Sequence, residues 1–156
     1  MLIQTKTAKI IELIESCRYS IHDLSRIEAS HRVPRFNMPL ELGIALYRST
    51  KAKHQVYVFE SKAFRAQRST SDINKLDPRI HNGRPIGVLS ALQSLFWQPD
   101  RMTVPEMLRS YRAVKAKLPA LLRNAGSRST FEKAVFEGLK VAALVEREAI
   151  KKTRNL

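Results

Sequence analysis

Two short β-rich runs on either side of one helix-like segment constrain the fold of this chain most strongly. The first run covers residues 19–24, and the second, residues 55–59 (QVYVF), is β-branched and aromatic, as buried strands are. Between them Asn37 is a favoured helix N-cap and Pro39 suits a first helical turn, so a helix is expected to begin here. This order predicts a βαβ unit with parallel strands and a right-handed crossover.

Apolar residues at helical spacing predict further helices on both sides of this unit. An amphipathic helix is expected over residues 5–17, and another over residues 85–97. The polar stretch of residues 61–84 is expected to form a short helix and a loop, because its Asp-Pro and Asn-Gly steps are turn signals. Together these segments predict an α/β domain over residues 1–97.

The remaining residues, 98–156, are expected to form a helical C-terminal extension. A helix start is indicated at Thr103 to Glu106, and the long apolar stripe that follows contains Pro119, which should kink or end the helix near Leu118. A last helix is expected from about Thr130. Residues 104–152 are therefore predicted to form a helical hairpin.

Composition narrows the class of protein. The chain has 156 residues, a formal net charge of +14 and a single cysteine. The charge favours a polyanionic partner such as nucleic acid, whereas the lone Cys17 argues against a disulfide framework and a thiolate zinc site. Since no apolar run is long enough to span a membrane and residues 1–17 are broken by charges, the chain is expected to be cytoplasmic with no membrane partner.

Familiar cofactor and metal motifs are missing from the sequence. It contains no GxGxxG, no Walker-type phosphate loop, no GxSxG and no paired histidines flanking a glutamate. We therefore expect no cofactor and no metal site.

Two acidic residues flank the first strand-to-helix connection. Asp23 ends the first strand and Glu41 lies in the first turn of the expected helix, and open α/β sheets bind ligands outside the carboxyl ends of their strands. A structural interpretation stays open for each, because Glu41 would favour the helix dipole and Asp23 would cap local N–H groups. His22 is expected on the opposite sheet face from Asp23, as a satisfied polar residue.

The segment SCRYSIHDLS...RFNMPLELGIAL resembles a pattern of Rossmann-like proteins in the nucleoside 2-deoxyribosyltransferase and TIR-like group. It also looks like a set of uncharacterised bacterial proteins with the run IHDLSR...LPRFNMPFELG, to which the later SDINKLDPRIHNG is similar. The resemblance covers roughly residues 10–97. It implies a Rossmann-like, mostly parallel sheet that recognises a nucleotide or nucleoside.

In this group the glutamate of the helix-opening segment is the catalytic carboxylate for breakage of an N-glycosidic bond, which on this chain is Glu41. The resemblance implies deoxyribosyltransferase-like or NAD glycohydrolase-like activity, in which a carboxylate stabilises or traps the oxocarbenium character at C1′. It also implies that Asp23 holds sugar hydroxyls, with Ser25, Asn37 and Met38 as further ligand contacts.

Secondary candidates lie in two polar loops. Arg26, Arg32 and Arg35 are placed to meet a nucleotide phosphate, although solvated loop charges are the commoner case. Asp72, Asp77 and His81 belong to SDINKLDPRIHNG, for which a purely structural loop is the favoured interpretation.

Folds of this group normally begin with a strand before the helix with which this chain starts. Three alternatives follow: a shortened form, a strand remnant at Ile3, or a pocket completed by another subunit of a homo-oligomer. Two other functions stay open beside the nucleotide-binding domain. One is a non-catalytic basic module that docks on nucleic acid or an acidic partner, and the other is a subunit of a larger assembly.

Overall fold

The structure is a computed structural model, and it describes residues 6–25, 37–63, 76–96, 101–130 and 132–154. The chain divides into two compact units, Met1–Ala91 and Leu92–Leu156. The division falls inside helix α4 (Pro85–Leu95), which therefore contributes residues to both units.

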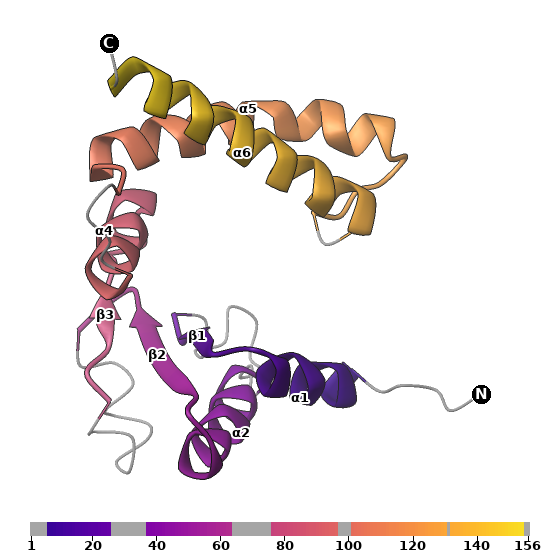
Figure 1. Cartoon of the computed structure of the whole chain (residues 1–156). Helices are drawn as coiled ribbons and strands as arrows, with labels where there is room; N and C mark the ends of the chain where they lie inside the picture. The colour runs from indigo at the N-terminus through magenta and orange to yellow at the C-terminus, as the bar shows by residue number, and fades with distance from the viewer. Residues whose placement is uncertain (1–5, 26–36, 64–75, 97–100, 131, 155–156) are drawn as a thin grey trace. The chain divides into compact units, whose positions relative to one another are not determined.

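A small parallel sheet forms the centre of the first unit (Figure 1). Its strands β1 (Tyr19–Asp23), β2 (Gln55–Glu60) and β3 (Arg79–Ile80) lie side by side in that order. Strands β1 and β2 pair in parallel from Tyr19 opposite Gln55 to Asp23 opposite Phe59. The expected α/β class and the parallel pairing of the first two strands are confirmed. The short β3 corrects the expectation of only helix and loop over residues 61–84, because Arg79 and Ile80 extend the sheet beside the end of β2.

Helix α2 (Asn37–Lys51) connects β1 to β2 and packs on both strands. Leu42 of the helix meets Val58 of β2 and Leu24, which directly follows β1, and each of these three side chains is at most 3% exposed. Their burial supplies the apolar contact that fixes the helix on this face of the sheet. Helix α1 (Lys6–Ser16) packs against α2.

A chain of hydrogen bonds ties the start of both long strands to the end of α1. The His54 Nδ1–H donates to the Cys17 carbonyl oxygen at 2.9 Å, so His54 Nε2 is free to accept from the Ser20 hydroxyl, also at 2.9 Å. The same hydroxyl oxygen accepts from His22 Nε2 at 2.9 Å. His22 is buried and satisfied, as expected, and burial lowers its pKa, followed by the repulsion that His22 and His54 would feel if both were protonated.

The second unit contains helices α5 (Val104–Asn124) and α6 (Lys133–Arg154). They run in opposite directions and pack along each other (Figure 1), as the predicted hairpin requires. Thr103 caps α5 in a capping box with Glu106, which confirms the predicted helix start. Of the two outcomes expected at Pro119, a kink or a helix end near Leu118, the helix end does not occur, since α5 continues to Asn124.

This continuation has a simple local cause. Pro119 is exposed, and proline in a helix removes one backbone hydrogen bond, so the carbonyl that loses its donor can bind water instead. Among the described helices none is long and apolar enough to cross a membrane.

Candidate functional site

Three polar side chains converge where β1 ends and where the chain leaves β3. The Ser25 hydroxyl and the Ser25 backbone N–H both donate to Asp23 Oδ1, the latter at 2.9 Å. His81 Nε2 lies 2.9 Å from the Ser25 hydroxyl oxygen and 3.5 Å from Asp23 Oδ1. The sequence separates Ser25 from His81 by 56 residues, so long-range pairing in the parallel sheet brings these residues together. We call Asp23, Ser25 and His81 the edge cluster.

The backbone around His81 explains how it is held in place. The His81 N–H donates to the Glu60 carbonyl oxygen at 2.9 Å, which extends the sheet by one bond beyond β3. Asn82 and Gly83 follow with φ of 54° and 66°, a left-handed pair that suits the Asn-Gly turn indicated by the sequence. A Cβ atom on Gly87 would lie 2.3 Å from the His81 carbonyl oxygen, so α4 can approach His81 only because residue 87 is glycine.

The hydrogen-bond directions determine which ring nitrogen of His81 carries the proton. The Gly83 backbone N–H donates to His81 Nδ1 at 3.1 Å, and an N–H group can only donate. Nδ1 therefore accepts, and a neutral His81 carries its proton on Nε2. From Nε2 the proton points at the Ser25 hydroxyl oxygen and at Asp23 Oδ1.

This arrangement contains a serine, a histidine and an aspartate, but it is not a hydrolytic triad. In a triad the histidine accepts the serine proton at Nε2 and donates from Nδ1 to the aspartate. Here Nε2 is the donor, and the Ser25 proton goes directly to the Asp23 carboxylate. Ser25 is consequently a positioning residue for Asp23, and His81 has the same role.

Asp23 is an ionised hydrogen-bond acceptor, and only one of its two carboxylate oxygens accepts bonds from described residues. Burial alone would raise the pKa of its carboxyl group, but the hydrogen bonds from Ser25 and then His81 outweigh burial and lower the pKa below its usual value. All the bonds that described residues donate to Asp23 end on Oδ1. Because the side chain is 51% exposed, Oδ2 can accept from hydroxyl groups of a ligand.

A second carboxylate lies at the same edge of the sheet, at the last residue of β2. Glu60 is 1% exposed, and neither of its carboxylate oxygens has a hydrogen-bond partner among the described residues. Strand alternation places Glu60 on the sheet face of Val58, while Asp23 shares a face with its pair Phe59. The two carboxylates therefore flank the carboxyl end of the sheet from opposite faces.

Sequence reasoning missed Glu60. The available signal was its position, since it ends a buried strand of a βαβ unit, where ligands of open α/β sheets bind. A buried carboxylate without partners is costly and therefore calls for a functional explanation.

Glu41 does not belong to the edge cluster. Helix α2 begins at Asn37 and has no acidic residue in its first turn, so the predicted first-turn position of Glu41 is wrong. One turn further along, the field of the helix N-terminus is much weaker. Glu41 is half-buried and makes no hydrogen bond to the described members of the cluster.

The other predicted contacts are dispersed. Asn37 is exposed as the first residue of α2, and Met38 packs against the apolar core of Leu42 and Val58, where it supports the helix. Asp77 is exposed in the segment before β3. The remaining candidates and the proposed strand remnant lie outside the described residues: Arg26, Arg32, Arg35, Asp72 and Ile3.

Within the described ranges no three His, Cys, Asp or Glu side chains gather closely enough to hold a metal ion. A scan against protein-family models and searches of curated proteins and solved structures find no match to this chain. The edge cluster offers hydrogen-bond acceptors and donors suited to a polar ligand.

Proposed function

We propose that the first unit is a Rossmann-like domain that binds a nucleoside or nucleotide at the carboxyl edge of its sheet. The observation that carries this proposal is the edge cluster, because Ser25 and His81 together hold Asp23 ionised, with its side chain half exposed and Oδ2 without a bond from any described residue. A carboxylate fixed in this way accepts hydrogen bonds from adjacent sugar hydroxyls, which is the role that the family resemblance gives to Asp23.

Glu60 supports the same proposal from the other face. Its two oxygens have no partner among the described residues, and because the side chain is 1% exposed, the N–H groups of a base or a further hydroxyl reach them only if the residues that cover Glu60 move aside on binding. A ligand seated over the sheet edge reaches residues of both faces, since the binding crevice of such folds lies beyond the strand ends. Binding would then satisfy a carboxylate that the described residues leave bare.

Binding is tested by titrating 2′-deoxyadenosine, adenosine and NAD into the protein in a calorimeter. Asp23→Asn keeps the shape of the side chain and removes its charge. Loss of a charge-assisted hydrogen bond, worth about 1.5–3 kcal/mol, should weaken binding by about 10- to 150-fold. Glu15→Gln, on the exposed surface of α1, is the matched control and should bind normally. No heat with any of these ligands would contradict the proposal.

Catalysis is a separate part of the proposal. The resemblance assigns nucleophilic attack on C1′ to Glu41, which lies outside the edge cluster, so this step requires the bound sugar to extend from Asp23 to α2. The Glu41 carboxylate oxygen then forms a bond to C1′, the base leaves with the bonding electron pair, and water or a second base displaces the carboxylate. Glu41→Gln should abolish release of free base from deoxynucleosides and of nicotinamide from NAD, while binding persists. Equal or absent turnover in both proteins counts against catalysis and leaves the binding proposal intact.

A second candidate function is a basic module that binds nucleic acid. Helix α5 supports it, because Glu106 is its only acidic residue and is engaged by Arg154, while its cationic side chains are exposed: Arg109, Arg112, Lys115, Lys117 and Arg123. Such binding would weaken steeply with salt and would be unaffected by Asp23→Asn. That the chain forms a homo-oligomer or belongs to a larger assembly stays a prediction. Light scattering tests the homo-oligomer by measuring the molar mass in solution.

A further inference from the structure

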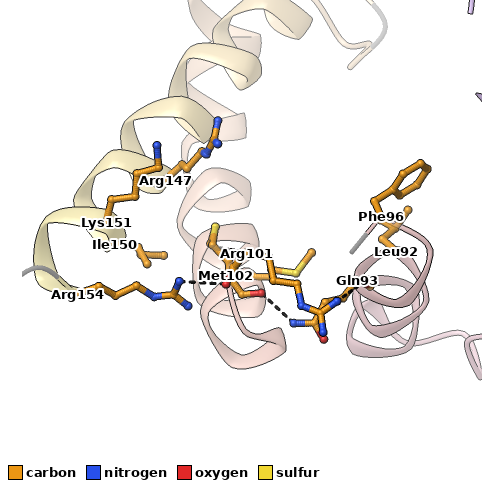
Figure 2. A pocket seen from close by; sticks show the side chains of 10 residues that line it. Leu92, Gln93, Phe96, Arg101, Met102, Arg147, Ile150, Lys151 and Arg154 are labelled. Atoms are coloured by element: carbon orange, nitrogen blue, oxygen red, sulfur yellow. Dashed lines mark hydrogen bonds between the residues drawn. The ribbon is translucent and has the colours of Figure 1, made fainter. Parts of the chain in front are cut away.

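The second unit contains a cavity of about 390 Å³ that the proposed nucleoside site does not use. It lies where the end of α4, the start of α5 and the last turns of α6 come together (Figure 2). Sites for small molecules usually enclose about 300–1,000 Å³, so this cavity has room for a ligand of modest size. All the residues that line it belong to Leu92–Leu156.

Hydrogen bonds within the second unit hold the walls of the cavity. Gln93 Nε2 donates to the Met102 carbonyl oxygen at 2.9 Å, and Arg101 Nη1 donates to the Gln93 carbonyl oxygen at 2.7 Å (Figure 2). Arg154 Nη1 donates to the Arg101 carbonyl oxygen at 3.0 Å, and its Nε donates to Glu106 at 2.9 Å. Two of the cations at the cavity, Arg101 and Arg154, therefore act as structural ties, and the cavity exists before a ligand arrives.

The remaining lining has an apolar part and a cationic part. The apolar part is made by Leu92, Phe96, Met102, Met107 and Ile150. Two methionines in this set allow the wall to adapt, because their side chains are unbranched and flexible. An apolar body of a ligand would find its contacts here.

The cationic part is formed by Arg147 and Lys151, which are one turn apart on α6 and lie on the same side of the cavity (Figure 2). Arg147 makes no hydrogen bond or ion pair with any described residue, and Lys151 pairs only with Glu148 of its own helix, at 3.2 Å. Both members of that pair are about half exposed, so the pair is weak and easily exchanged. None of the residues that line the cavity is acidic.

We propose that this cavity binds a small organic anion: a carboxylate, sulfonate or phosphate monoester carried by an aromatic or alkyl body. The anionic group lies between Arg147 and Lys151, where it relieves the repulsion of two like charges one helical turn apart. The body lies against Leu92, Phe96 and Ile150. A cation is repelled from this site, and a neutral molecule of the same shape gains only the apolar contacts.

The test compares two dyes of similar shape, the anion 8-anilinonaphthalene-1-sulfonate and the uncharged N-phenyl-1-naphthylamine, by fluorescence titration of the full chain. The sulfonate should bind with one molecule per chain. The double variant Arg147→Gln with Lys151→Gln should weaken the sulfonate by at least about tenfold, because two charge-assisted contacts are lost, and should leave the neutral dye unchanged. Circular dichroism checks that the variant retains its helices.

Two further variants make the result specific. Arg112→Gln with Lys115→Gln removes the same charge from exposed positions of α5 outside the cavity and should leave both dyes unchanged. Leu92→Gln alters the apolar wall and should weaken both dyes. The proposal is overturned if the sulfonate binds no better than the neutral dye, if several molecules bind per chain, or if both double variants weaken the sulfonate equally.

Discussion

Replacing Glu60 by methionine should make the first unit more stable. The Glu60 side chain is 1% exposed, and its two carboxylate oxygens have no hydrogen-bond partner among the described residues. A buried polar group without a partner costs about 1–3 kcal/mol in protein mutational data, and more when it is charged. Methionine has a similar volume and no polar group that needs a hydrogen bond. Glu60→Met should therefore raise the free energy of unfolding by about 1–3 kcal/mol.

Native-state hydrogen exchange of the β2 amides measures this change in the first unit alone, because it reports local opening rather than unfolding of the whole chain. A gain of 1–3 kcal/mol slows exchange by about 5- to 150-fold. Glu15→Met, at an exposed position of α1, is the control and should change the free energy by no more than about 0.5 kcal/mol.

The outcome separates two explanations of Glu60. If Glu60→Met is more stable and binds nucleosides poorly, the bare carboxylate is retained for its ligand at the expense of stability. If the variant is destabilised by more than about 1 kcal/mol, the carboxylate has a stabilising partner in the folded protein and the reasoning is refuted.

Three further predictions concern residues that stabilise one or the other unit. Gly87→Ala should destabilise the first unit and weaken nucleoside binding, because the new Cβ would lie 2.3 Å from the His81 carbonyl oxygen; exchange of the β2 amides and calorimetry measure both effects. Because burial lowers the pKa of His22, the unfolded chain binds a proton at His22 more readily than the folded protein does. The free energy of unfolding should therefore be highest above about pH 6.5 and fall as the pH drops below it, and His22→Gln should weaken this pH dependence in melting curves. Hydrogen bonds from Arg154 and then Thr103 lower the pKa of Glu106 to about 2, so ionised Glu106 should stabilise the folded protein above about pH 4.5 and lose this effect as the pH falls towards 2. Glu106→Gln should therefore lower the melting temperature at pH 7 and have the same melting temperature as the unsubstituted protein near pH 2.

The sequence predicted the parts of the fold that depend on local pattern. The strands around Ile21 and Val58, the helix between them and the helix start at Thr103 all follow from side-chain type and spacing. Strand β3 could not be found in this way, because two residues in a polar stretch carry no periodicity. The helix end expected at Pro119 could not be judged from sequence either. The free-energy cost of a proline inside a helix depends on whether the backbone carbonyl that loses its N–H donor can bind water.

The candidate site was predicted only in pieces. Asp23, Ser25 and His81 were each singled out, but their contact depends on β3 pairing with β2 and on the turn at Gly83, which are long-range features. The position of Glu41 depended on the first residue of a helix, and a shift of a few residues moved it out of the first turn.

The central claim is that a nucleoside binds at the carboxyl edge of the sheet through Asp23. Nuclear magnetic resonance of isotope-labelled protein tests it most directly, with 2′-deoxyadenosine added stepwise while the backbone amides are followed. The Ser25 and Gly83 amides, which donate to Asp23 and His81, should shift in proportion to binding, and the amides of α6 should not. Shifts confined to α6, or an unchanged Ser25 amide at saturating nucleoside, would contradict the claim.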